Sequence, residues 1–190
     1  MRVASVGLLV VVGAAALGVG VPLVRVALTK GPAEYGAWSL MLGAAWILVA
    51  GAGASLRAFE AADATGLRSA FLAWMPILGA AGLGQLFVGA LTYLMPVVIG
   101  GGPSAVRVGV GVLEAGAPIR EAARNVASVL ALAVASLGGT SAERLTIAAW
   151  VVLLATYLVD IVLMARCGVA QARAKRAVAS SPTTQGGRRG

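Results

Sequence analysis

The sequence predicts an all-α bundle of transmembrane helices. The chain has 190 residues, of which 59% are hydrophobic and only 12% charged, whereas soluble domains carry about a quarter charged residues. Residues 69–103 contain no charged side chain, and a run of roughly eighteen or more apolar residues is typical of a membrane-spanning helix. Basic residues gather at the ends of the apolar runs, as they do at the cytoplasmic edge of membrane helices. We therefore expect a multi-pass protein of the plasma membrane, surrounded by the lipid bilayer.

The hydropathy pattern divides the chain into a helical domain, residues 1–170, and a basic tail. Within the domain we predict five spans, at residues 3–23, 36–56, 71–98, 119–137 and 145–165. Residues 171–190 are rich in polar and basic residues, and we expect them to form a disordered cytoplasmic tail.

The distribution of Lys and Arg predicts the orientation of these spans. Eleven of the 15 basic residues lie on the same side of the membrane as the C-terminal tail. This count places Arg107, Arg120 and Arg124 in the segment that follows the third span. The other four lie on the opposite side. Because basic residues favour the cytoplasmic side, we expect the N-terminus outside and the C-terminus in the cytoplasm.

The first span has a second interpretation. Arg2, an apolar stretch and three consecutive alanines at residues 14–16 fit a cleavable signal peptide. The apolar run continues to Val24, beyond the usual length of such a signal, which favours a retained span. Cleavage would leave four spans. Small residues four positions apart in the first two spans, such as Ala14 and Gly18, predict close packing of helix backbones.

The third span carries a narrow polar face. Gln85, Gly89, Thr92 and Pro96 follow one another at steps of four, three and four residues, so they share one side of a helix. The face predicts either an interhelical packing seam or the lining of a polar path through the bundle. We favour the seam, because amides inside membranes commonly hydrogen-bond a neighbouring helix.

A glycine-rich stop follows this span. Residues Gly100, Gly101, Gly102 and Pro103 are expected to end the helix, because glycine adopts a positive φ at little cost. The next stretch, residues 104–125, mixes charged residues with valines and glycines. We expect it to lie along the cytoplasmic surface of the membrane.

The fifth span contains Asp160, an acidic residue within an otherwise apolar run. An ionisable residue at this depth is a candidate functional residue. We favour a structural interpretation, in which Asp160 pairs with a basic neighbour such as Arg166 near the cytoplasmic edge. The alternative is a role in proton relay.

The residue inventory argues against catalysis by this chain alone. The sequence contains no histidine and one cysteine, Cys167, so imidazole chemistry and an intrachain disulfide are both excluded. We find no paired-carboxylate, Ser/His or Cys/His arrangement, and we predict no catalytic site, cofactor or metal site. The methionines of the spans are interpreted as packing residues. The net charge of +8 follows from membrane topology, and no nucleic-acid partner is expected.

Two stretches resemble a known family. They are AEYGAWSL at residues 33–40, with Gly43 and Trp46, and QLFVGALTYLMPVV at residues 85–98, followed by GGGP. They are similar to the C-terminal part of the membrane region of actinobacterial multicopper-oxidase-like proteins, itself similar to subunit I of haem-copper oxidases. The likeness covers about residues 33–130. The resemblance implies a membrane region that accompanies a copper-binding cupredoxin domain, and metal ligation by histidines. Since the chain has no histidine, no ligand position carries over.

These observations predict a non-catalytic membrane module or subunit. Its expected partner is a copper or respiratory redox protein, another membrane subunit or a second copy of itself. The alternative is a small transporter or channel in which Gln85, Thr92 and Asp160 form the polar path. A transporter often shows internal repeats, and we find none that convinces, which favours the first hypothesis.

Overall fold

The computed structural model describes residues 35–135 and 139–180, together with isolated positions between residues 7 and 25. Within this part of the chain all regular secondary structure is helical, and no strand occurs. The all-α prediction is confirmed for these residues. Apart from the isolated positions, the predicted span at residues 3–23 lies outside the described part, as do residues 181–190.

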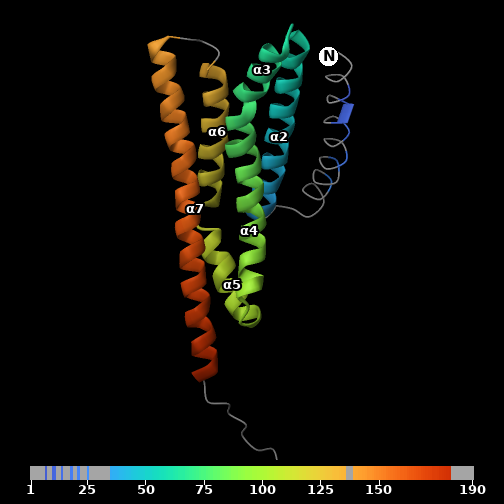
Figure 1. Ribbon diagram of the computed structural model, residues 1–190. Helices are drawn as coiled ribbons and strands as arrows, with labels where there is room; N and C mark the ends of the chain where they lie inside the picture. The colour runs from blue at the N-terminus through green and yellow to red at the C-terminus, as the bar shows by residue number, and fades with distance from the viewer. Residues whose placement is uncertain are drawn as a thin grey trace, which may run out of the picture.

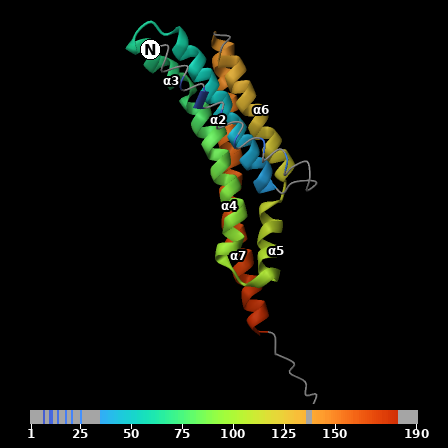
Figure 2. The same cartoon turned by 90° about the vertical axis from the view of Figure 1, so that its right-hand side faces the viewer.

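The helices are arranged as a bundle of nearly parallel rods (Figures 1 and 2). Figure 1 shows α3 and α4 as one continuous rod beside α2, while α5 and α6 follow each other along the length of α7. The elements in chain order are α2 (Tyr35–Glu60), α3 (Ala64–Pro76), the π-helical segment η1 (Ile77–Leu83), α4 (Gly84–Ile99), α5 (Gly102–Leu113), α6 (Ala117–Ala135) and α7 (Thr140–Ser180).

Three of these rods are long and apolar enough to cross a membrane: Tyr35–Glu60, Ala64–Ile99 and Thr140–Ser180. They contain the predicted spans 36–56, 71–98 and 145–165. Residues 119–135 of the predicted span 119–137 lie in α6, a helix of 19 residues, and residues 136 and 137 lie outside the described part. Helix α6 carries Arg120, Glu121 and Arg124, and it is not among the three rods selected by length and composition.

A π-helical segment follows a proline in the middle of the α3–α4 rod. Pro76 ends α3, and a proline inside a helix lacks an N–H donor and clashes with the preceding turn. The helix widens over Ile77–Leu83, and the N–H of Gly84 bonds the carbonyl oxygen of Gly79, five residues earlier. Tyr157 of α7 donates a hydrogen bond to the carbonyl oxygen of Ala80 within this segment. The widened turn is therefore anchored to α7.

Glycines bring α2 and α4 into close contact. A Cβ atom added to Gly43 would lie 2.8 Å from the backbone nitrogen of Leu86, and one added to Gly89 would lie 2.8 Å from the carbonyl oxygen of Gly36. Such distances leave no room for a side chain. The small-residue packing predicted for the second span is present here, and it lets the two backbones touch.

The turn between α4 and α5 lies in the glycine-rich stretch. Helix α4 ends at Ile99, and Gly100 and Gly101 have φ angles of 70° and 107°. Residues 104–125, predicted to lie along the membrane surface, instead form most of α5 and the start of α6. Both helices stand alongside α7 (Figure 1). The segment packs on α7 because Gly109 leaves room for the side chain of Gln171, which would lie 2.6 Å from an added Cβ.

Helix α7 is longer than the sequence pattern indicated. It continues to Ser180, so residues 171–180 do not belong to the disordered tail predicted from residue 171. Two features explain the extension. The segment is rich in Ala, Arg and Lys, which are strong helix formers. Gln171 is also buried, and its Nε2 donates to the carbonyl oxygens of Pro96 at 3.0 Å and Ala105 at 3.2 Å.

Candidate functional site

A charged cluster lies inside the bundle, centred on Asp160 of α7. Its two carboxylate oxygens accept hydrogen bonds from two arginines of α6: Oδ1 from Arg120 and Oδ2 from Arg124. The side chain of Asp160 is only 2% exposed and that of Arg124 is fully buried. The carboxylate is thus held between two guanidinium groups in the interior, where charged hydrogen bonds are strong.

The spacing along α6 places both arginines on one face. Arg120, Arg124 and Ser128 follow at steps of four residues, and all three are buried. Residues four apart lie on the same side of a helix. The opposite face is apolar and exposed, with Ile119 at 77% and Val126 at 66%. Helix α6 therefore directs its charges inward and its aliphatic side chains outward.

Two tyrosines complete the surroundings of the ion pairs. The hydroxyl of Tyr35, at the start of α2, lies 3.1 and 3.2 Å from the two oxygens of Asp160 and donates to the carboxylate. The guanidinium carbon of Arg120 lies 4.4 Å from the centre of the Tyr35 ring, and that of Arg124 lies 4.4 Å from the centre of the Tyr157 ring. Both distances are within the range of cation–π attraction. The two tyrosine rings therefore stabilise the buried guanidinium groups.

Arg120 also joins the two halves of the broken α5–α6 rod. Its Nη2 donates to the carbonyl oxygen of Leu113, the last residue of α5. The chain turns between the helices through Gly116, which has a φ of 65°. Carbonyl groups in the last turn of a helix lack an intrahelical partner. Arg120 satisfies one of them while it pairs with Asp160.

A second acid balances the second arginine. Oε2 of Glu121 lies 3.7 Å from Nη1 of Arg124, so the ionised cluster has two positive and two negative groups. Asn125 donates to the carbonyl oxygen of Glu121 at 2.8 Å. Because an isolated ion in a low-dielectric interior is very unfavourable, this neutrality makes the burial of all four groups tolerable.

The residues predicted from the sequence lie at different distances from this cluster. Asp160 is at its centre. Gln85 is fully buried and reaches the edge of the cluster, since its Nε2 lies 3.3 Å from Oδ1 of Asn125. Thr92 donates to the carbonyl oxygen of Val88 in its own helix at 2.8 Å. Gln85 and Asp160 are thus connected through α6, whereas the hydroxyl of Thr92 is engaged within α4.

The partners of Asp160 were not predicted. The expected neighbour, Arg166, is exposed, and the ion pairs are formed with Arg120 and Arg124, 40 and 36 residues earlier in the chain. These arginines were counted as loop charges. One signal in the sequence points to their position: the four-residue spacing of Arg120, Arg124 and Ser128, which marks a polar stripe on an otherwise apolar helix.

A hollow of about 460 Å³ opens between α2 and α6 beside the cluster. Its polar wall is formed by Tyr35, Glu121 and Asn125, and its apolar wall includes Trp38 and Leu42. Trp46, also on α2, donates through Nε1 to Oδ1 of Asn125 at 2.7 Å. The hollow therefore meets the outer edge of the cluster, while Asp160 lies behind it.

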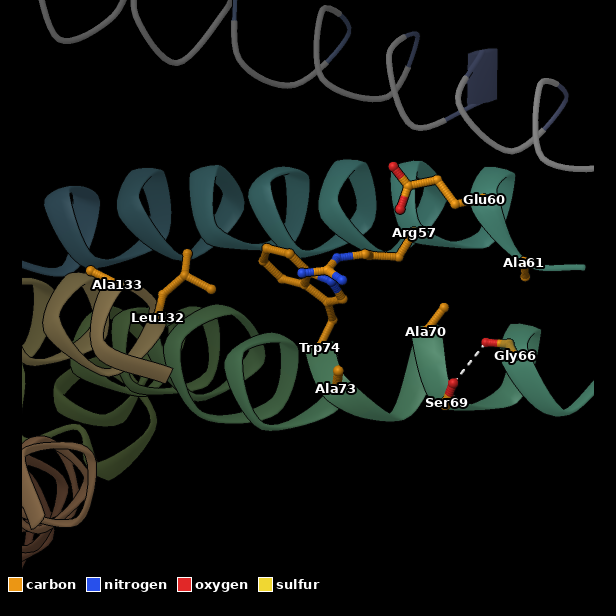
Figure 3. A pocket seen from close by; sticks show the side chains of 10 residues that line it. All are labelled: Arg57, Glu60, Ala61, Gly66, Ser69, Ala70, Ala73, Trp74, Leu132 and Ala133. Atoms are coloured by element: carbon orange, nitrogen blue, oxygen red, sulfur yellow. Dashed lines mark hydrogen bonds between the residues drawn. The ribbon is translucent and has the colours of Figure 1, made fainter. Parts of the chain in front are cut away.

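A larger hollow, of about 670 Å³, lies at the other end of α2, beside Arg57 and Glu60. Figure 3 shows Arg57 and Trp74 pointing into the space between α2 and α3, and Ser69 bonded to the backbone of Gly66. Its charged residues, Arg57 and Glu60, are exposed. This hollow lacks the buried, paired charges of the Asp160 cluster, and we regard the latter as the candidate functional site.

Within residues 35–135 and 139–180, no group of three or more His, Cys, Asp and Glu side chains is arranged to hold a metal ion. Cys167 is a buried free thiol. Comparison of the chain with protein-family models, curated proteins and solved structures found no match. The candidate site is therefore interpreted from its own geometry.

Proposed function

We propose that this protein is a multi-pass protein of the plasma membrane that serves as a non-catalytic module and packs against a partner. In this proposal it has five spans, with the N-terminus outside and the C-terminus in the cytoplasm. The partner is a copper or respiratory redox protein, as the resemblance of residues 33–40 and 85–98 to multicopper-oxidase-like membrane regions implies.

The observation that carries the proposal is the reversed polarity of α6. In water, a helix buries its apolar side and exposes its charges. Helix α6 does the opposite, since Arg120 and Arg124 are buried while Ile119 and Val126 are exposed. Hydrocarbon around the bundle makes this arrangement stable, because it solvates aliphatic side chains and excludes unpaired charges. The 19 residues of α6 correspond to about 28 Å, close to the thickness of the bilayer core.

The bonding within the cluster supports a structural role. Asp160, Arg120 and Arg124 pair with one another and join α6 to α7, and Tyr35 adds α2. Hydrogen bonds between helices are one of the main forces that hold membrane bundles together. The charges that a catalyst or relay would need are here engaged in holding three helices. A rigid module is what such an arrangement provides.

Co-purification tests the partnership. The full chain, tagged and extracted in a mild detergent, is purified from its native membrane, and co-eluting chains are identified by mass spectrometry. The proposal predicts a cupredoxin-containing or respiratory membrane protein at a stoichiometric level. A preparation that contains only copies of this chain, and that conducts ions in liposomes, would contradict it.

The hollow between α2 and α6 favours a second candidate, a small transporter or channel. Glu121 and Asn125 line this hollow, and Gln85 and Asp160 lie behind them as parts of a polar path. Flux measured in liposomes with the Asp160→Asn variant tests this alternative. A specific flux that falls in Asp160→Asn, but not in the exposed-acid control Glu143→Gln, would support transport. Equal flux in both variants would remove Asp160 from the path.

A further inference from the structure

The C-terminal half of α7 carries a concentrated positive charge. Between residues 161 and 180 the helix contains no acidic residue and four basic ones: Arg166, Arg173, Lys175 and Arg176. All four side chains are exposed. Within residues 35–135 and 139–180, none of them takes part in the ion pairs of Arg120 and Arg124 with Asp160 and Glu121. This surface is free to bind an anion.

Two of these arginines flank a hollow between α5 and α7. Arg166 and Arg173 are seven residues apart, so they lie on one face of α7 at a separation of about 10 Å along its axis. Together with Val112 of α5 and Val169 of α7, they line a space of about 430 Å³. The hollow thus combines two guanidinium groups with an aliphatic floor.

The surrounding side chains locate this hollow at the level of a membrane boundary. Gln171, between the two arginines in sequence, bonds the carbonyl oxygen of Pro96 at 3.0 Å. The next two residues of α4, Val97 and Val98, are 62% and 80% exposed. Exposed valines and exposed arginines therefore occur at the same height of the bundle. Mixed surfaces of this kind suit the interface between hydrocarbon and headgroups, where arginines extend toward phosphate.

We infer that the hollow between α5 and α7 binds an anionic phospholipid. Arg166 and Arg173 bind its phosphate groups, since guanidinium groups match phosphate oxygens in charge and geometry. Val112 and Val169 contact the upper part of the acyl chains. A free phosphate ion would gain nothing from the valines, whereas a lipid uses both parts of the surface. A lipid with two phosphate groups, such as cardiolipin, fits two arginines on one face best. The inference rests on the membrane placement proposed above.

Native mass spectrometry tests the inference. The full chain is mixed in detergent with cardiolipin, phosphatidylglycerol or phosphatidylcholine, and the lipid that stays bound after the detergent is removed is measured. We expect retention to decrease in that order. In the double variant Arg166→Gln/Arg173→Gln, retention of the anionic lipids should fall about fivefold for each arginine removed. The matched control is Arg144→Gln, which removes an arginine near the other end of α7 and should leave retention unchanged. Circular dichroism confirms that the variants remain folded.

The outcomes separate this inference from the proposed function. Equal retention of phosphatidylcholine and the anionic lipids, or the same loss in Arg144→Gln as in the double variant, would overturn the lipid site alone. Displacement of the lipid by millimolar inorganic phosphate would also overturn it, since the site would then recognise the ion without its acyl chains. A chain that fails to sediment with membranes would overturn the membrane placement itself.

Discussion

Asp160 of α7 and Arg124 of α6 form an ion pair in which the carboxylate is 2% exposed and the guanidinium is fully buried. Arg120 binds the other oxygen of the same carboxylate. A buried charge without its partner is strongly unfavourable, whereas a paired one is tolerated. The pair therefore favours the observed register of α6 against α7. Sliding either helix by one turn would bring only one of the two arginines beside the carboxylate and leave the other buried without it.

Removing the acid should destabilise the bundle. In Asp160→Asn, two buried guanidinium groups lose their shared carboxylate, and we expect the free energy of unfolding to fall by about 3–5 kcal/mol. The measurement is unfolding in mixed micelles with increasing SDS, followed by circular dichroism. Glu143→Gln is the control, since Glu143 is an exposed acid in the first turn of the same helix. Equal stability of the two variants would show that the cluster holds nothing together.

The losses of stability caused by replacing Asp160 and Arg124 should not be additive. In Arg124→Met, the carboxylate of Asp160 still pairs with Arg120. Replacing Asp160 by Leu in that variant therefore removes fewer interactions than the same replacement does in the native protein. We expect a coupling energy of about 0.5–3 kcal/mol from the double-mutant cycle in the same SDS titration. The pair Arg144 and Asp160, at distant levels of the bundle, supplies a cycle in which no coupling is expected. A coupling near zero for Arg124 and Asp160 would contradict the ion pair.

A methyl group at Gly43 should separate α2 from α4. The added Cβ atom would lie 2.8 Å from the nitrogen of Leu86 and 2.9 Å from the carbonyl oxygen of Gly82, and neither backbone atom can move independently. Overpacking of this kind costs about 1–3 kcal/mol. Gly79→Ala is the matched control, because a Cβ at Gly79 meets nothing within 4 Å. Thermal unfolding in detergent should rank Gly43→Ala below the native chain and Gly79→Ala at or above it.

Replacement of Gln171 should loosen the lower end of the bundle. The variant Gln171→Leu removes the amide that bonds the carbonyl oxygens of Pro96 and Ala105, so α4, α5 and α7 lose a common contact. Hydrogen–deuterium exchange should become faster in residues 102–113, while the amides of α2 serve as an internal reference. Unchanged exchange in α5 would mean that its packing does not depend on this amide.

Much of the bundle was predictable from composition. The predicted spans 36–56, 71–98 and 145–165 each fall inside one long helical rod, because uninterrupted apolar sequence is a strong signal. The π segment after Pro76 is less predictable, since its hydrogen bond from Tyr157 depends on a contact 77 residues apart. The extension of α7 to Ser180 was missed because Ala, Arg and Lys were interpreted as a tail, although they favour helix.

The candidate site was predictable only in part. Asp160 was identified because an acid within an apolar run is unusual. Its partners were not, since Arg120 and Arg124 were assigned by their nearness to the third span and not by the face of the helix they share. Tyr35 is 125 residues from Asp160 in sequence, and no pattern in a single sequence indicates such a contact. Long-range pairing depends on how the rods assemble.

The accessibility of single cysteines along α7 tests the central claim, that this helix crosses a membrane, most directly. In a Cys167→Ser background, Leu154→Cys introduces a thiol at a position that is 60% exposed on the bundle surface, and Lys175→Cys introduces one in the basic end. A water-soluble maleimide should label Lys175→Cys only after the cells are opened, and Leu154→Cys only after detergent is added. Equal labelling of both positions in opened cells, before detergent is added, would contradict the claim, because water would then reach the surface that we assign to lipid.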